Sequence, residues 1–117
     1  MVRRSRRADG LVVARGDVWL AALDPTIGRE IQKTRPCLIV SPAEMNDRLH
    51  TIMAAPMTTG SRPAPSRIPL SFQGKAGLIL LDQLRTLDKS RLMRRLGQVG
   101  TDTLATTLAT LREIFEE

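Results

Sequence analysis

The sequence is poor in the residues that form disulfides and metal sites, because it holds one cysteine, Cys37, and one histidine, His50. A single cysteine rules out an internal disulfide, and the pair falls short of the usual metal-ligand clusters. Cys37 lies in an apolar run and is expected to be a small buried hydrophobic residue. We therefore expect no metal and no other cofactor, and a Cys37–His50 nucleophilic pair is disfavoured.

Long apolar stretches are also absent. No run approaches the roughly 18 consecutive apolar residues of a membrane span. The apolar segment 11–14, which follows an arginine-rich N-terminus, is too short for the hydrophobic region of a signal peptide. We therefore expect a cytoplasmic protein, and its 117 residues give room for one domain with one modest core.

Aromatic side chains make up only 3% of the chain, which leaves few platforms on which single-stranded bases could stack. Basic residues, by contrast, outnumber acidic ones by 18 to 12, and the net charge is +6. This balance favours a polyanionic partner, either a nucleic acid or an acidic protein. Part of the charge lies in residues 1–14, which we expect to form a flexible basic arm ahead of a single domain, 15–117.

Hydrophobic periodicity predicts a series of short strands. They are expected at 17–23, 37–40, 51–55, 67–70 and 77–81, with shorter candidates at 85–87 and 96–99. The proline in 67–70 favours an edge strand. Ser41-Pro42-Ala43-Glu44 has the form of a capping box that opens a helical turn through about residue 49. Residues 24–34 and 58–65 are expected to be loops.

The pattern changes to helical spacing at the end of the chain. Apolar residues recur there after the capping candidates Thr101 and Asp102, namely Leu104, Leu108, Leu111, Ile114 and Phe115. They predict an amphipathic C-terminal helix with one face in the core or an interface. Several short strands followed by one helix are typical of a mainly β protein, a small half-open antiparallel barrel.

Five short motifs follow one another from residue 15 onward. They are Arg15-Gly16-Asp17-Val18-Trp19, then Leu23-Asp24-Pro25-Thr26 with Gly28 and Glu30, then Arg35-Pro36 with Ser41-Pro42, then Pro56-Met57-Thr58-Thr59, and finally residues 82–89. In this order and spacing they resemble the MazF/PemK family of bacterial toxins. The resemblance implies an SH3-like barrel of the MazF/CcdB type.

The same resemblance implies a function and partners. It implies a homodimeric, sequence-specific, metal-independent endoribonuclease that cleaves single-stranded mRNA to 2′,3′-cyclic phosphate and 5′-hydroxyl ends and so inhibits translation and growth. It also implies a cognate MazE-like antitoxin with an acidic segment that folds across the active site, and binding to operator DNA only through the antitoxin complex. The positive charge agrees with both partners.

Metal-free RNA cleavage requires a base for the ribose 2′-hydroxyl and charge stabilisation at the phosphate. Because the chain has one histidine, a two-histidine mechanism within a protomer is excluded. Three residues match the family's catalytic positions. The resemblance implies that Glu30 acts as general base, that Arg35 binds the scissile phosphate, and that Thr58 donates to a phosphoryl oxygen.

Four further residues are expected to contact substrate, and they are Lys33, Thr59, Asp82 and Arg85. Asp82 is either a substrate contact or the cap of a turn, and Arg85 either touches a phosphate or pairs with Asp82. Some plasmid-borne relatives carry a catalytic arginine two residues before this aspartate, where this chain has Leu80. That departure weakens a catalytic role for Asp82.

Two other interpretations compete with a ribonuclease. A gyrase poison of the CcdB type shares the expected fold but relies on a C-terminal Trp-Gly-Ile tail, which this chain lacks. A non-catalytic family member would only bind antitoxin and operator. Fold alone leaves both open, so the site residues have to separate them. The arginines at 91, 94 and 95 form either a phosphate-binding rim or a solvated connection.

Overall fold

The computed structural model describes residues 12–23 and 33–117. The strands within these ranges are β1 (Asp17–Ala22), β2 (Thr34–Ile39), β3 (Thr51–Thr58), β4 (Arg67–Phe72), β5 (Lys75–Leu80), β6 (Arg85–Asp88) and β7 (Leu92–Gln98). Helix α1 (Ala43–Arg48) connects β2 to β3, and helix α2 (Thr101–Ile114) follows β7. Two single-turn 3-10 helices, η1 (Leu81–Gln83) and η2 (Lys89–Arg91), flank β6.

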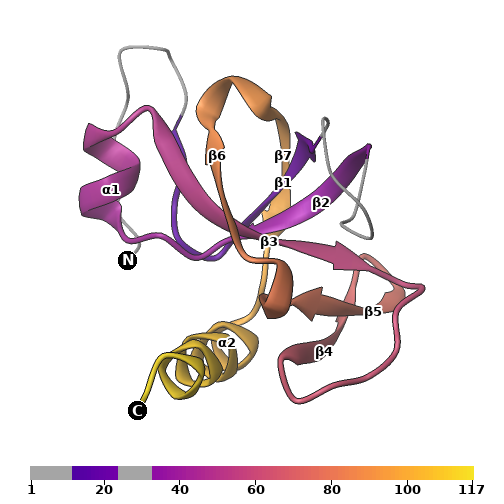
Figure 1. Cartoon of the computed structure of the whole chain (residues 1–117). Coiled ribbons are helices and arrows are strands. Elements are labelled where there is room, and N and C mark those ends of the chain that lie inside the picture. The colour runs from indigo at the N-terminus through magenta and orange to yellow at the C-terminus, as the bar shows by residue number, and fades with distance from the viewer. Residues whose placement is uncertain (1–11, 24–32) are drawn as a thin grey trace.

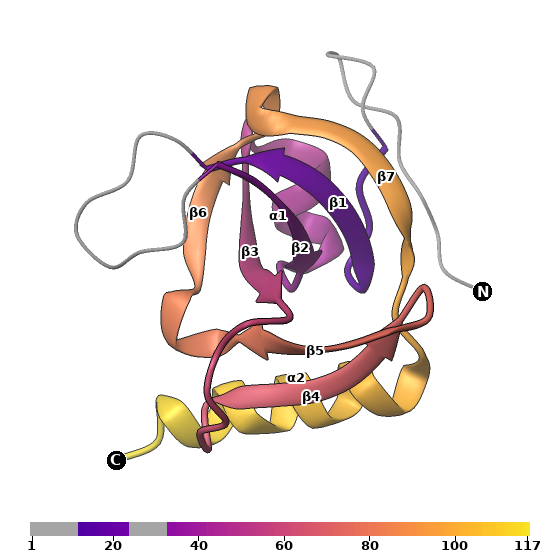
Figure 2. The ribbon, with the colours of Figure 1, turned by 90° about the vertical axis from the view of Figure 1, so that its right-hand side faces the viewer.

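The strands form one curled antiparallel sheet in the order β4-β5-β3-β2-β1-β7, with β6 paired to β3. Strand β3 is shared along its length, because its first half pairs with β6 and its last two residues pair with β5. Figures 1 and 2 show how the sheet curls round on itself, with α2 running alongside β4. This arrangement confirms the expected half-open barrel with a C-terminal helix.

Side chains alternate between two apolar clusters on the faces of the sheet, as the period of two along a strand requires. Trp19 of β1 and Cys37 of β2 belong to one cluster. Their neighbours Val18 and Leu38 belong to the other. Cys37 is fully buried, which confirms its expected role as a core residue. Val13 is also buried, so the packed part of the chain begins ahead of the boundary expected at residue 15.

Every strand except β1 is longer than the sequence pattern predicts. Strand β2 begins at Thr34, so Arg35 lies in a strand rather than in the loop where we expected it. Pro36 is tolerated because β3 pairs with β2 only from Cys37 onward, and the missing N–H leaves no gap in that ladder. Strand β3 continues to Thr58, and β7 begins at Leu92 instead of residue 96.

The capping box predicted for α1 is wrong. Pro42 is the N-cap residue and no side chain caps the helix. The Ser41 hydroxyl instead donates to Oδ1 of Asn46 at 2.6 Å and accepts from the Met53 backbone N–H at 3.0 Å. Ser41 therefore ties α1 to the start of β3, a tertiary role that overrides the local capping preference.

Helix α2 also differs from expectation at its start and end. Gly100 is its N-cap, so neither Thr101 nor Asp102 caps it, although Asp102 in the first turn still favours the helix dipole. Leu104 packs against Gly16, where a Cβ atom would lie 3.2 Å from the leucine side chain. Phe115, just past the helix, is 74% exposed. No helix in the described ranges is long and apolar enough to cross a membrane.

Candidate active site

A cavity of about 300 Å³ opens between the ends of β2, β3 and β5 and the β4–β5 turn. Three of the residues expected at the site line it, namely Arg35, Thr58 and Thr59. The remaining lining residues are Pro36, Met57, Leu70, Phe72, Gln73, Lys75, Gly77, Leu78 and Leu96. The cavity therefore combines one cationic and hydroxyl-bearing side with a mainly apolar wall.

Arg35 reaches the cavity from β2, where it lies opposite Ala21 of β1. Its Nε atom is buried and has no hydrogen-bond partner among the described residues. A buried guanidinium N–H without an acceptor is costly, and a ligand oxygen that supplies the acceptor removes that cost. Phosphate oxygens match the guanidinium fork in charge and geometry. Arg35 is thus prepared to bind an anion.

Thr58 is the last residue of β3 and lies opposite Leu78 of β5. Its Oγ1 atom accepts a hydrogen bond from the backbone N–H of Gly60 at 3.2 Å. Because that bond uses an oxygen lone pair, the hydroxyl hydrogen remains free to be donated. The Thr58 hydroxyl can therefore still donate to a ligand in the cavity that Thr58 and Arg35 both line.

The lining residues from the β4–β5 hairpin and β7 were not foreseen from the sequence. Phe72, Gln73 and Lys75 come from the β4–β5 hairpin, and Leu96 comes from β7. The Gln73 side chain donates to the carbonyl of Leu96 at 3.0 Å, which ties the hairpin to β7. No local motif marks these residues, because only the curl of the sheet brings them to the cavity.

Asp82 does not line this cavity. In η1 its two carboxylate oxygens accept from Arg67 of β4, Oδ1 from Nε at 3.2 Å and Oδ2 from Nη2 at 3.1 Å. The hydrogen bonds from Arg67 lower the pKa of Asp82, so the carboxylate stays ionised. Of the two alternatives for Arg85, pairing with Asp82 is not seen, because the partner of Asp82 is Arg67, a residue that no sequence motif marks.

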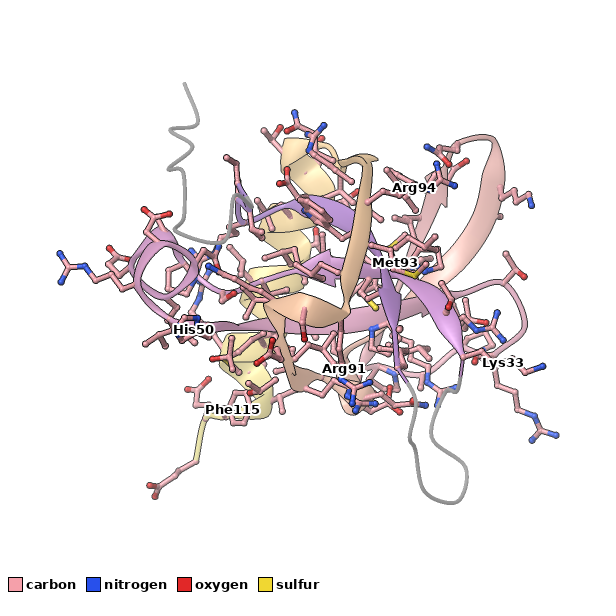
Figure 3. The ribbon with its side chains drawn as sticks, turned by 90° about the horizontal axis from the view of Figure 1, so that it is seen from above. Lys33, His50, Arg91, Met93, Arg94 and Phe115 are labelled. Carbon is pink, nitrogen blue, oxygen red and sulfur yellow. The ribbon has the colours of Figure 1, made fainter. Side chains whose placement is uncertain are left out.

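Arg85 and Lys33 also lie away from the cavity lining. The Arg85 guanidinium reaches back to the carbonyl of Leu23 at 3.5 Å. Lys33 is exposed, has a positive φ of 69°, and accepts at its backbone oxygen from Leu23 N–H. Figure 3 shows Lys33 and His50 at opposite sides of the molecule. Glu30, the expected general base, lies outside the described residues.

Residues 14–115 match the family of PemK-like, MazF-like toxins of type II toxin–antitoxin systems. The chain belongs to this family. It is 39% identical over 107 residues to "Endoribonuclease PemK" of Escherichia coli, an alignment that covers 86% of this chain and 80% of that protein.

Solved structures give the same assignment for the fold of this toxin. MazF from Deinococcus radiodurans superposes with a TM-score of 0.79 at 29% identity, covering 89% of this chain and 96% of that one. A mycobacterial endoribonuclease in complex with its cognate antitoxin superposes with a TM-score of 0.73 at 25% identity, covering 86% and 92%. The barrel expected from the sequence is therefore the family's barrel.

The arginines at 91, 94 and 95 do not form a single rim on the toxin. Arg91 donates to the carbonyl of Ala22 at 3.2 Å. Arg95 forms an ion pair with the buried Asp17 at 3.1 Å and so anchors β7 to the start of β1. Arg94 is exposed, and Figure 3 shows it well apart from Arg91. At least Arg91 and Arg95 thus have structural partners.

Cys37 is not available to the toxin as a nucleophile. Burial raises the pKa of its thiol to about 12, which keeps it protonated at neutral pH. No group of three His, Cys, Asp or Glu side chains in the described part of the toxin is placed to hold a metal ion. The chemistry available at the cavity is that of a guanidinium, hydroxyls and whatever the segment around Glu30 supplies.

Proposed function

We propose that the cavity containing Arg35 and Thr58 is the site at which this toxin cleaves single-stranded mRNA without a metal ion. The single observation that carries this proposal is the buried Nε of Arg35, which has no acceptor among the described residues, on a side chain that lines one cavity together with Thr58. Both positions match those expected for catalysis. The endoribonuclease names of its relatives support the reaction class.

The proposed reaction is an internal phosphoryl transfer. The ribose 2′-oxygen loses its proton to Glu30, attacks the adjacent phosphorus, and the bond from phosphorus to the 5′-oxygen breaks as that oxygen takes up a proton. Arg35 binds the phosphoryl oxygens and stabilises the negative charge that grows in the transition state. Thr58 donates its hydroxyl hydrogen to one of the same oxygens. The products are a 2′,3′-cyclic phosphate and a 5′-hydroxyl end.

The apolar wall of the cavity supports a single-stranded substrate. Phe72, Leu70 and Leu96 offer surfaces against which an unpaired nucleobase can pack. A base in a duplex is stacked on its neighbours and is not free to enter such a cavity. The placement of these side chains next to Arg35 therefore favours RNA that is held by its phosphate and by one splayed base.

The test is cleavage of a long single-stranded RNA in excess EDTA with full-length protein, Arg35→Ala and Arg48→Ala. Arg48→Ala removes the same charge from the exposed end of α1, on the opposite side of the ribbon from β4 and β5 (Figure 1). We expect discrete cuts with 5′-hydroxyl ends from the parent and from Arg48→Ala. Removal of one charge-stabilising donor typically costs about 100- to 1,000-fold, so Arg35→Ala should lose nearly all activity.

Two outcomes contradict the proposal. One is cleavage by Arg35→Ala at the rate of the parent, which moves the active site elsewhere. The other is no cleavage by well-folded, antitoxin-free protein on RNAs that cover many sequence contexts. In that case trapping of gyrase, or plain antitoxin and operator binding, becomes the function to examine.

We also propose that the toxin binds a cognate MazE-like antitoxin, reaches operator DNA only through that complex, and acts in the cytoplasm, where mRNA is translated. A structural neighbour is an endoribonuclease in complex with its cognate antitoxin. The net charge of +6 suits an acidic antitoxin segment as well as RNA. Binding of that segment across the Arg35 cavity would block cleavage, so the toxin would inhibit growth only when released.

A second copy of the chain is the proposed occupant of an apolar groove beside α2. The groove measures about 480 Å³ and is lined by Met53, Leu84, Leu108, Leu111 and the exposed Phe115, with Arg15 and Arg112 among its lining residues. The chain end beside Phe115 carries Glu116 and Glu117. Phe115 and the two carboxylates that follow it complement an apolar groove with two arginines in its lining. Two copies related by a twofold axis can therefore each place this segment against the groove of the other.

A further inference from the structure

The connection between β3 and β4, residues 59–66, is held at its far end by the Arg67–Asp82 ion pair. Arg67 also donates from Nη1 to the carbonyl of Arg62 at 2.9 Å, and the Ser66 hydroxyl contacts Oδ1 of Asp82 at 3.5 Å. The backbone adds a bond from Leu81 N–H to the carbonyl of Ser66 at 3.0 Å. Asp82 thus fastens the connection to η1 through several contacts.

The near end of the same connection is part of the cavity. Thr58 and Thr59 line it, and the Gly60 backbone N–H orients the Thr58 hydroxyl. Figure 2 shows the connection leaving the end of β3 and descending to the start of β4. Loss of the Arg67–Asp82 pair would therefore release one end of a segment whose other end lines the cavity.

We propose that Asp82 is a positioning residue that acts through Arg67 to hold residues 59–66, and with them Thr58 and Thr59, in the place that RNA binding requires. Both of its oxygens are occupied by Arg67 at hydrogen-bond distance, which leaves it poorly suited to take a proton from substrate. It also lies outside the cavity lining. This assignment rests on the proposed ribonuclease function, because the cavity is the one described for that reaction.

A positioning role and a general-base role give different kinetics. A general base raises the rate by about 100- to 10,000-fold, mainly in kcat. Its ionisation produces the acid limb of the pH–rate profile. A residue that holds substrate-contacting groups in place lowers kcat/KM but leaves that limb in place, because it takes no proton from the substrate. Loss of either partner of the pair should then have the same effect, since each removes the same restraint.

The experiment compares Asp82→Asn, Arg67→Ala, their double variant and the reversed pair Arg67→Asp with Asp82→Arg, all in the full-length chain. Asp102→Asn is the matched control, an exposed carboxylate on α2. Each variant is checked by thermal unfolding and by the NMR signal of the Gly60 amide. We expect each single variant to lose up to about 100-fold in kcat/KM, because misplacement of a substrate-contacting group by about 1 Å has costs of this order.

The double variant should be no worse than the worse single variant, because residues that act as one unit are not additive. The acid limb of the Asp82→Asn profile should match that of the parent, the Gly60 amide should shift in both single variants, and the reversed pair should recover most of the loss.

Three results overturn the positioning role. They are loss of the acid limb with a fall in kcat in Asp82→Asn alone, effects of the two single variants that add, and parent-like kinetics in both. If a single variant fails to fold, the reversed pair decides. Recovery of activity in the reversed pair supports the restraint, and a folded but inactive reversed pair contradicts it. Failure of the proposed function is distinguishable, because Arg35→Ala would then cleave RNA as the parent does, or the folded parent would not cleave at all. In either case the shift of the Gly60 amide still tests the restraint.

Discussion

Gly77 of β5 lies so close to β3 that a Cβ atom on it would stand 2.8 Å from the carbonyl oxygen of Thr58. Backbone atoms cannot yield as the end of a flexible side chain does, so only glycine permits this approach of the two strands. The contact falls at a residue that lines the cavity. The glycine at 77 thus allows the close pairing that fixes the backbone of Thr58, alongside the restraint on residues 59–66.

Substitution Gly77→Ala should therefore reduce cleavage by moving Thr58. We expect a loss of up to about 100-fold in kcat/KM, the usual cost of a misplacement near 1 Å. Overpacking at this point should lower the free energy of unfolding by about 1–3 kcal/mol. Gly100→Ala is the control for cleavage, because a Cβ there meets nothing within 4 Å and Gly100 does not line the cavity. Full activity in folded Gly77→Ala would show that the position of Thr58 does not limit the reaction.

Replacement of the Thr58 hydroxyl tests its role as a donor. Thr58→Val keeps the shape of the side chain but removes the hydroxyl, and should lower kcat by about 100-fold if the donor stabilises the transition state. Thr58→Ser keeps the hydroxyl and the bond from Gly60, and should retain most of the activity. Single-turnover cleavage of a short RNA measures both. Equal loss in the two variants would assign Thr58 a packing role instead.

Cys37 should make the protein less stable at high pH. Its pKa is raised from 9.0 to about 12 in the folded chain, whereas the unfolded chain ionises near the lower value. The unfolded state therefore gives up its proton first, so the stability that the protonated thiol contributes below pH 9 is lost as pH rises toward 12. Denaturant unfolding between pH 9 and pH 12 should show a fall in the free energy of unfolding of the parent, and a smaller fall in Cys37→Ala.

The groove beside α2 should be the site of self-association. Phe115→Glu places a charge at the centre of the proposed contact and should shift the protein from dimer to monomer in light scattering coupled to size exclusion. Met93→Glu is the control, because Met93 is also an exposed apolar residue, 58% accessible, and Figure 3 shows it well away from Phe115. A dimer that Phe115→Glu leaves intact would place the interface elsewhere. A monomeric parent would show that the groove does not bind a second copy.

Much of the fold follows from patterns that act over a few residues. The alternation in β1 and the helical spacing from Leu104 to Leu111 depend on local geometry, and both elements appear where expected. The helix caps do not, because Ser41 is drawn into contacts with Asn46 and Met53, which tertiary packing brings near.

The residues of the candidate site could likewise be predicted only where a local motif marks them. Arg35 and Thr58 were identified through motifs, and the structure brings them to one cavity. The Arg67–Asp82 pair joins residues fifteen positions apart and carries no local signal. Gln73 enters the cavity because the β4–β5 hairpin folds over β7, which only the curl of the whole sheet determines.

Strand β1 takes one of its two neighbours, β7, from the opposite end of the chain, and β7 also carries Leu96 to the cavity. While the polypeptide grows on the ribosome, β1 therefore has one open edge and the cavity lacks part of its wall. Pairing between the ends of a chain has to wait for the later end to emerge. The toxin therefore completes its cleft only after β7 has been synthesised and has paired with β1, so a nascent chain that lacks β7 does not carry a finished site.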